Sequence, residues 1–241
     1  MAAGATITRV RTATYHFYRW RYESAFLVNL GLAGLFACLT GFGALVKVYL
    51  PWTPVPITGQ LFFVLASAVV LGKHFGGLSQ ILYALVGVLA VPWFAGPNTN
   101  PQPLFDGVPG LYRGAGGVAI ISGPTFGYIL GFILTATAIG WAVDSRVRYR
   151  RPASLGLLLL AGIGLVYLLG AGWFYAWWTT GFGLAASRGG LSFGDLMVRA
   201  VIPFVPLDLV KAGIVLGIGS LILPNRPFAR EKDAGSAEPT V

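Results

Sequence analysis

The sequence predicts an all-α membrane protein, a bundle of six transmembrane helices with a long extracytoplasmic loop between the third and fourth helices. Three observations predict this fold: an apolar composition, six apolar runs, and basic residues that cluster between alternate runs. Of the 241 residues, 56% are hydrophobic and 10% are charged, and the mean hydropathy is +0.73. Soluble domains carry roughly 25% charged residues. Water is therefore not the main solvent of this chain.

The apolar runs have lengths typical of membrane helices, which need about 20 mostly apolar residues each. The second run is short, and a turn at Gly72-Lys73-His74 separates it from the third. The predicted spans are residues 25–46, 61–71, 75–91, 123–143, 154–178 and 198–223. The chain accordingly divides into a basic N-terminal segment (1–24), a transmembrane domain (25–223) and a polar tail (224–241) that we expect to be disordered.

Basic residues give the chain a net charge of +9, and their positions predict its orientation. With a cytoplasmic N-terminus, 12 of the 17 lysines and arginines face the cytoplasm: four before the first span, one after the second, four after the fourth and three after the sixth. This asymmetry follows the positive-inside rule. Both termini are therefore predicted to be cytoplasmic, in a multi-pass protein of the plasma or inner membrane. Such short clusters contact the headgroups of the lipid bilayer, and a nucleic-acid partner is not expected.

The loop between the third and fourth spans, residues 92–122, is the longest internal loop and is rich in Gly, Pro and Asn. Loops of this length are usually functional or disordered. Residues 96–100 within it are a candidate lid.

Asp208 and Lys211 are the most informative residues, because they are ionisable groups inside the sixth apolar run. Their i, i+3 spacing places both side chains on one face of a helix. A charge in a span costs roughly 2.5–3.5 kcal/mol on insertion scales and usually faces the bundle interior. The pair is therefore a candidate ligand site, in which the carboxylate accepts from ligand N–H groups and the ammonium binds a carbonyl or carboxylate. The alternative is a structural ion pair.

The segment from residue 51 to residue 60, PWTPVPITGQ, resists helix formation because its three prolines fix φ and lack N–H donors. At membrane depth, irregular backbone must be shielded by protein or line a cavity. Thr58 and Gln60 would then offer a hydroxyl and an amide to a polar ligand. The alternative, equally open from the sequence, is an interfacial turn before the next helix.

Three further polar residues lie in or beside apolar runs. Thr125 and Tyr128 follow Gly123-Pro124, a good helix start, and share one helix face. Tyr83 lies inside the third span, where its hydroxyl needs a hydrogen-bond partner. Each is a candidate ligand contact, and packing or anchoring at the membrane interface is the alternative.

The first span carries a small-xxx-small pattern, Ala33 and Ala37, continued by Gly41. Such a pattern lets another helix approach closely, either a partner's or one of the same bundle. Because the pattern is frequent in Gly-rich spans, it favours neither reading.

The sequence predicts no catalytic centre, no metal site and no cofactor. Its single cysteine, Cys38, lies in an apolar run, and its two histidines, His16 and His74, are isolated. There is no G-x-x-x-x-G-K-[ST] motif, so the chain has no P-loop with which to hydrolyse ATP. Active transport would require a partner.

Several of these segments, in order, resemble the BioY family, the biotin-binding S components of energy-coupling factor (ECF) transporters. They are VPITGQLFFVL at 55–65, LGK at 71–73, YALVG at 83–87, VPWFAG at 91–96, GPTFGY at 123–128 and DLVKA at 208–212. The resemblance covers about residues 25–223. As an ordered set the segments are specific, whereas each alone is weak.

The resemblance implies a compact six-helix substrate-binding fold with a biotin site near the outer face. It implies that the chain is not an enzyme and that its partners are a transmembrane T component and two ATPase subunits. In the family, residues matching Asp208 and Lys211 contact the ligand, and small residues matching Ala33 and Ala37 dock the T component. A loop asparagine near the ligand in the family corresponds here to Asn98 or Asn100.

The expected function is thus the biotin-binding subunit of an uptake transporter. An S component for another small vitamin is the nearest alternative. A membrane-embedded enzyme would need paired carboxylates or a His cluster at one depth, and a channel would show repeated polar stripes. The chain has neither pattern.

Overall fold

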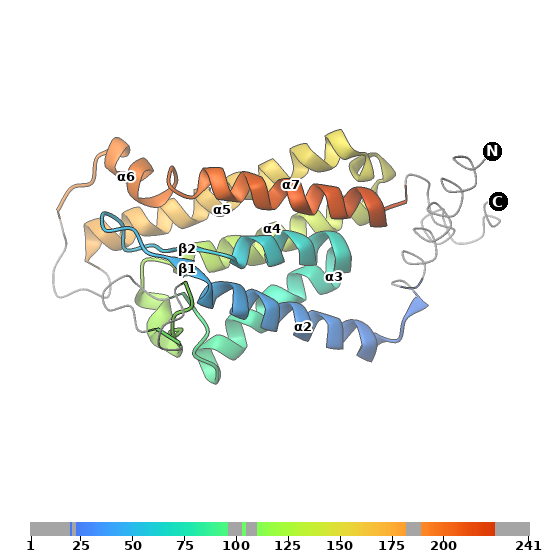
Figure 1. Ribbon diagram of the computed structural model, residues 1–241, viewed down its shortest axis with the longest axis horizontal. Coiled ribbons are helices and arrows are strands. Elements are labelled where there is room, and N and C mark those ends of the chain that lie inside the picture. The colour runs from blue at the N-terminus through green and yellow to red at the C-terminus, as the bar shows by residue number, and fades with distance from the viewer. Residues whose placement is uncertain (1–19, 21–22, 96–102, 105–109, 182–188, 225–241) are drawn as a thin grey trace.

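The computed structural model describes residues 20, 23–95, 103–104, 110–181 and 189–224. Its elements along the chain are α2 (Phe26–Leu45), β1 (Lys47–Val48), β2 (Ile57–Thr58), α3 (Gln60–Leu89), the 3₁₀ helix η1 (Val118–Ser122), α4 (Phe126–Ser145), the 3₁₀ helix η2 (Val147–Arg150), α5 (Pro152–Thr180), α6 (Phe193–Ala200) and α7 (Val205–Ile222). The long helices lie side by side in a bundle (Figure 1). The predicted segments 1–24 and 224–241 fall almost entirely outside the described residues.

Five helices of the described chain are long and apolar enough to cross a membrane: α2, α3, α4, α5 and α7. The 30-residue α3 provides two crossings, because its backbone breaks at Gly72, with φ 75° and ψ −161°. The described part of the chain therefore provides six crossings, as the sequence predicts, and α2 starts at the same end of the bundle at which α7 finishes (Figure 1). The all-α membrane fold is confirmed.

The break in α3 depends on close contacts with α4. The N–H of Lys73 donates to Asp144 Oδ2 over 2.9 Å, so a side chain of α4 holds the first free N–H after the break. Gly140 lies against the carbonyl of Gly72, where a Cβ would come within 2.5 Å of the oxygen. The turn predicted at Gly72 is thus a sharp reversal that two small residues make sterically possible.

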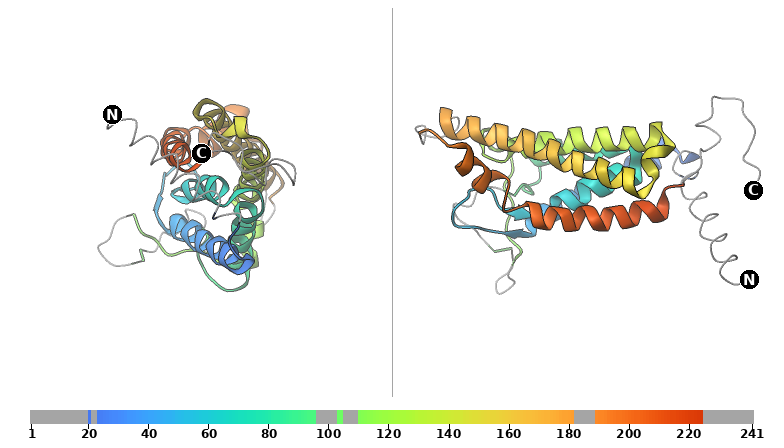
Figure 2. Two further views of the ribbon diagram at one scale, coloured as in Figure 1. Left: turned by 90° about the vertical axis from the view of Figure 1, so that its right-hand side faces the viewer. Right: turned by 90° about the horizontal axis from the view of Figure 1, so that it is seen from above.

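The first arm of α3, residues 60–71, is only about 18 Å long at 1.5 Å per residue. This is shorter than a hydrocarbon core of about 30 Å. Its Val64, Leu65, Ala68 and Val69 are fully buried. In the left view of Figure 2 this cyan helix lies near the centre of the bundle. Because most of its surface is covered by protein and not by lipid, it need not match the full hydrocarbon thickness, which explains why the second apolar run is so short.

The sixth predicted span, residues 198–223, is wrong at its start. The structure ends α6 at Ala200 and begins α7 at Val205, with a turn between them. Pro203 has no N–H to donate to a helical carbonyl, whereas Pro206 is tolerated because it lies in the first turn of α7. Residues 198–200 therefore belong to the short helix α6, which Ser192 caps by accepting from the N–H of Asp195.

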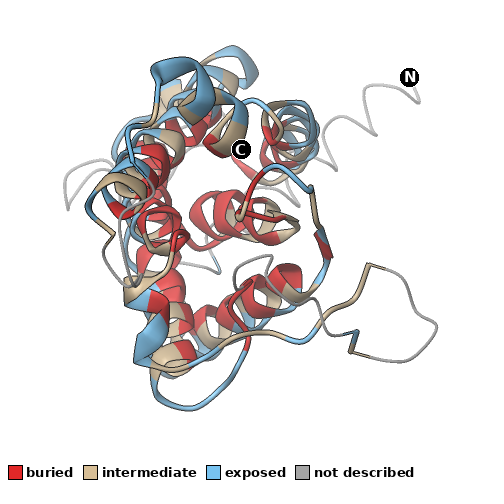
Figure 3. Cartoon of the chain, turned by 90° about the vertical axis from the view of Figure 1, so that its left-hand side faces the viewer, coloured by how far each residue is buried: buried red, intermediate tan, exposed pale blue. Residues whose placement is uncertain are grey.

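Apolar side chains also cover much of the outside of the bundle. Leu27, Phe42, Leu157, Leu168 and Leu221 are all more than half exposed within the chain. Buried residues lie on the faces that helices turn toward one another (Figure 3). Apolar residues on both the inner and outer faces are typical of helices solvated by lipid. We conclude that the chain is a multi-pass membrane protein.

Candidate functional site: a polar pocket at one end of the bundle

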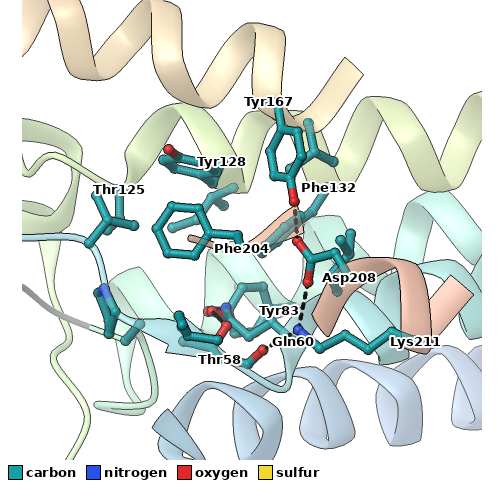
Figure 4. Close-up of a pocket in the computed structure, with 17 residues that line it drawn as sticks. Thr58, Gln60, Tyr83, Thr125, Tyr128, Phe132, Tyr167, Phe204, Asp208 and Lys211 are labelled. Carbon is teal, nitrogen blue, oxygen red and sulfur yellow. Dashed lines mark hydrogen bonds and ion pairs between the residues drawn. The ribbon is translucent and has the colours of Figure 1, made fainter. Parts of the chain in front are cut away.

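A pocket lies among the segment before α3, α3 itself, α4, α5 and α7, near the end of the bundle that carries β1, β2 and α6 (Figures 1 and 4). Its empty volume, counting the open mouth, is about 600 Å³. The structure brings seven predicted site residues together in its wall: Thr58, Gln60, Tyr83, Thr125, Tyr128, Asp208 and Lys211. The eighth, Asn98, lies outside the described residues, as does the candidate lid at 96–100.

Asp208 is buried in the first turn of α7, and both its carboxylate oxygens are engaged. Lys211 Nζ lies 2.7 Å from Oδ1, and the hydroxyl of Tyr167 on α5 donates to Oδ2 over 2.6 Å (Figure 4). Lys211 Nζ also donates to the carbonyl of Thr58 over 2.6 Å, so the pair ties α7 to the strand before α3. Each carboxylate oxygen retains a lone pair for a ligand donor.

A second polar chain runs from Thr58 along the adjoining wall of the pocket. The hydroxyl of Thr58 donates to Gln60 Oε1 over 2.9 Å, and Gln60 Nε2 donates to the hydroxyl oxygen of Tyr83 over 2.7 Å. Tyr83 is fully buried, and its ring stacks on Trp93, whose indole N–H bonds the carbonyl of Tyr83. Because the Tyr83 oxygen already accepts, its hydrogen is available to a ligand acceptor.

The remaining wall is largely aromatic and apolar. Tyr128 meets Phe204 edge-on at 6.3 Å between ring centroids, and its hydroxyl donates to the carbonyl of Ala200 over 2.5 Å. The ring lies against Gly170 of α5, where a Cβ would overlap it. Thr125 is buried beside Tyr128 at the start of α4. Tyr128 therefore also anchors α6, in addition to lining the pocket.

The Pro-rich segment, residues 51–60, lines the cavity, which is one of the two interpretations that the sequence left open. Val55, Pro56, Ile57 and Thr58 all contribute to the pocket wall. The segment is held by the two-stranded sheet, in which Lys47 pairs with Thr58, and by the N–H of Gly59, which bonds the carbonyl of Gly43 over 2.8 Å. Its backbone is thus satisfied by protein, as irregular chain at membrane depth requires.

Sequence reasoning missed Tyr167, although a signal was present. Like Tyr83, it is a hydroxyl-bearing ring in the middle of an apolar span and needs a partner. The apolar lining residues, Phe132, Val166 and Phe204 among them, carry no signal that separates pocket from core. Only the packing of helices assigns them to the cavity.

Ala33 and Ala37 do not form a free surface on this chain. Their exposed fractions are 0% and 2%, and α2 packs on α3. In the structure, the small-xxx-small pattern thus serves packing within the bundle, the second of the two interpretations of this pattern. The expectation that these two side chains face a docking partner needs correction, because they point inward.

The polar groups of the pocket are suited to binding. Within the described residues, no group of three His, Cys, Asp or Glu side chains could hold a metal ion. One carboxylate, one ammonium and several neutral hydroxyl and amide groups face an apolar cavity. Such a site orients a small neutral or singly charged molecule through a few hydrogen bonds.

Comparisons with a family model and with individual relatives identify the same family. The model of the BioY family matches residues 19–106 and 104–227. The biotin transporter BioY of Thermotoga maritima is 34% identical over 179 residues, which cover 74% of this chain and 86% of that protein. The probable biotin transporter BioY of Pyrococcus horikoshii is 34% identical over 197 residues, covering 82% and 97%.

A solved structure shares the fold. The crystal structure of the S-component for biotin from an ECF-type ABC transporter superposes with a TM-score of 0.61, at 19% identity, covering 80% of this chain and 89% of that one. The family match extends over most of the transmembrane bundle described above. The chain belongs to the BioY family.

Proposed function

We propose that this chain is the biotin-binding S component of an ECF-type biotin uptake transporter. It binds biotin at the outer face and delivers it inward with energy from partner ATPases. The observation that carries the proposal is the buried Asp208, held by Tyr167 and Lys211 in the pocket of a chain whose relatives are biotin transporters. The role is binding and transport, and no catalytic step is proposed.

The chemistry of biotin matches the two polar walls. Its ureido ring offers two N–H donors and a carbonyl acceptor, and its tail ends in a carboxylate. The ureido N–H groups suit the free lone pairs of Asp208, and the ureido carbonyl suits the hydroxyl hydrogen of Tyr83 or the ammonium of Lys211. The ligand carboxylate would be repelled by Asp208. We therefore place the ureido ring, and not the tail, at Asp208.

The partners we propose are a transmembrane T component and two ATPase subunits, because the chain lacks a P-loop of its own. The solved relative is itself described as part of an ECF-type ABC transporter. A partner helix that meets α2 would do so on its outward face, which carries Gly31, Gly34 and Cys38. Cytoplasmic termini, proposed from the basic clusters, would place the pocket at the outer side.

Purified wild-type chain in detergent is expected to bind radiolabelled biotin saturably, with a Kd below about 1 μM, equivalent to about 8 kcal/mol of binding free energy. Equilibrium dialysis measures this directly. Competition with thiamine and riboflavin tests the alternative of another vitamin. A monodisperse protein that shows no saturable biotin binding would refute the proposed ligand, and displacement of bound label by another vitamin would support the alternative.

Tyr167→Phe is expected to weaken biotin binding by about five- to tenfold, with little change in thermal stability. The substitution removes the hydroxyl that orients Asp208 Oδ2 but keeps the ring. One hydrogen bond to a charged group contributes about 1.5–3 kcal/mol, part of which water recovers in the open pocket. The matched control is Tyr175→Phe on the same helix, whose exposed ring is absent from the pocket. Equal affinities for Tyr167→Phe and wild type would contradict this role.

A further inference from the structure

Lys47 is a buried cation beside the pocket that the proposed binding scheme does not use. It lies in β1, directly after α2, with 2% of its surface exposed. Its Nζ donates to the carbonyls of Ala95 over 2.6 Å and Arg113 over 2.9 Å. Within the described chain it has no carboxylate at ion-pair distance, and its Nζ lies 5.8 Å from the centroid of the Tyr49 ring.

The two carbonyls belong to segments that we call the loop arms, residues 92–95 and 110–115. The arms pair through Phe94 and Ala115, whose N–H groups each donate to the other's carbonyl over 2.8 Å. A Cβ on Gly114 would overlap the carbonyl oxygen of Pro92, so the arms lie in close contact. Lys47 reaches one carbonyl on each arm, which makes it a cross-link between them.

The arms matter for the pocket because Ala95 is part of its wall. Lys47 is also the cross-strand partner of Thr58, which lines the pocket and bonds Lys211 through its carbonyl. A single residue therefore connects both loop arms, through its side chain, with the polar wall of the site, through its backbone pairing with Thr58. Loss of the ammonium would leave two carbonyls without this donor.

Burial of this ammonium is costly, and burial lowers its pKa from 10.5 to about 8. An apolar side chain would fill the space without that cost. The two charge-assisted hydrogen bonds are what an apolar residue could not supply. The free-energy cost of burying the Lys47 ammonium is thus consistent with a need for its hydrogen bonds to the two loop arms.

We propose that Lys47 is a positioning residue for ligand retention: by joining the carbonyls of Ala95 and Arg113, it keeps the pocket wall at Ala95 in place over the bound ligand. The cross-link itself follows from the contacts, whereas the effect on retention rests on the proposed binding of biotin. The role predicts a faster ligand off-rate when the donors are removed, with a smaller effect on the association rate.

The test compares Lys47→Met, Lys47→Arg and a control, Arg150→Met. Arg150 is also a buried cation, 1% exposed, that donates to a backbone carbonyl, that of Val143, but it lies in η2, away from the pocket. Two measurements are made on the full chain in detergent. Hydrogen exchange of the loop arms is recorded without ligand, and the biotin off-rate is recorded by chasing radiolabelled biotin with unlabelled biotin.

For Lys47→Met we expect at least about tenfold faster exchange at Phe94 and Ala115 and a biotin off-rate raised about tenfold, equivalent to about 1.4 kcal/mol. Lys47→Arg, which keeps a cationic donor, should show smaller increases in the exchange rate and in the off-rate than Lys47→Met. Arg150→Met should leave the exchange rate of the loop arms and the biotin off-rate unchanged. Unchanged exchange in Lys47→Met would overturn the cross-link. Faster exchange with an unchanged off-rate, or an equal rise in Arg150→Met, would overturn the role in retention. If wild type binds no biotin, the proposed function and the retention role fail together, while exchange still decides the cross-link.

Discussion

Asp208→Asn is expected to weaken biotin binding at least about 100-fold, the largest effect on affinity that the structure predicts. Among the described residues of the pocket wall, this carboxylate is the only acidic group, and it is buried in the first turn of α7. Replacement loses charge-assisted hydrogen bonds of about 1.5–3 kcal/mol each and leaves Lys211 without its counter-charge. Equilibrium binding of radiolabelled biotin measures the change.

A double variant separates ligand binding from a structural ion pair, the two readings of Asp208 and Lys211. Asp208→Asn combined with Lys211→Met removes both charges, so any instability due to an unpaired ammonium should be relieved. If the pair contacts ligand, thermal stability recovers while binding stays lost. If the pair is only structural, binding recovers together with stability, and the proposed site is wrong.

The matched control for Asp208→Asn is Asp195→Asn. Asp195 is an exposed carboxylate in the first turn of α6, where it bonds Ser192. The same chemical change at this position should leave biotin affinity within about twofold, because the side chain is absent from the pocket. A comparable loss of affinity in both variants would show that the effect of Asp208→Asn is not specific to the pocket.

Gly72→Ala is expected to cost at least about 3 kcal/mol of stability, the largest effect on folding. The backbone of Gly72, at φ 75° and ψ −161°, lies in a region that is essentially restricted to glycine, at a cost of about 1–3 kcal/mol for other residues. An added Cβ would also overlap the carboxylate of Asp144, and overpacking costs typically 1–3 kcal/mol more. The apparent Tm in detergent should fall by about 6–12 °C.

Gly164→Ala on α5 is the control for this substitution. Gly164 lies in regular helix, with no heavy atom within 4 Å of an added Cβ. Alanine has the higher helix propensity by about 1 kcal/mol, so this variant should be as stable as wild type or slightly more stable. A Tm for Gly72→Ala equal to that of Gly164→Ala would contradict the role of the reversal in α3.

The errors of the sequence reading have physical causes. Residues 198–223 are mostly apolar, so hydropathy joins α6 to α7, although Pro203 marks the interruption. Ala33 and Ala37 form a pattern that predicts close helix packing but does not say with which helix. In the structure that face is turned inward, against α3. Periodicity alone does not distinguish an inward from an outward face when both are apolar.

The sequence by itself determined the solvent, the six crossings and most of the polar side chains that line the pocket. Long apolar runs cannot be stable in water, and ionisable or hydroxyl groups within them need partners, so Asp208, Lys211 and Tyr83 could be identified without coordinates. The tertiary structure alone decided which groups meet. Tyr167, Thr58 and Lys47 acquire their roles from contacts 41 to 153 residues apart in the chain. Such contacts arise from how helices pack around the short central arm of α3, and no local pattern encodes them.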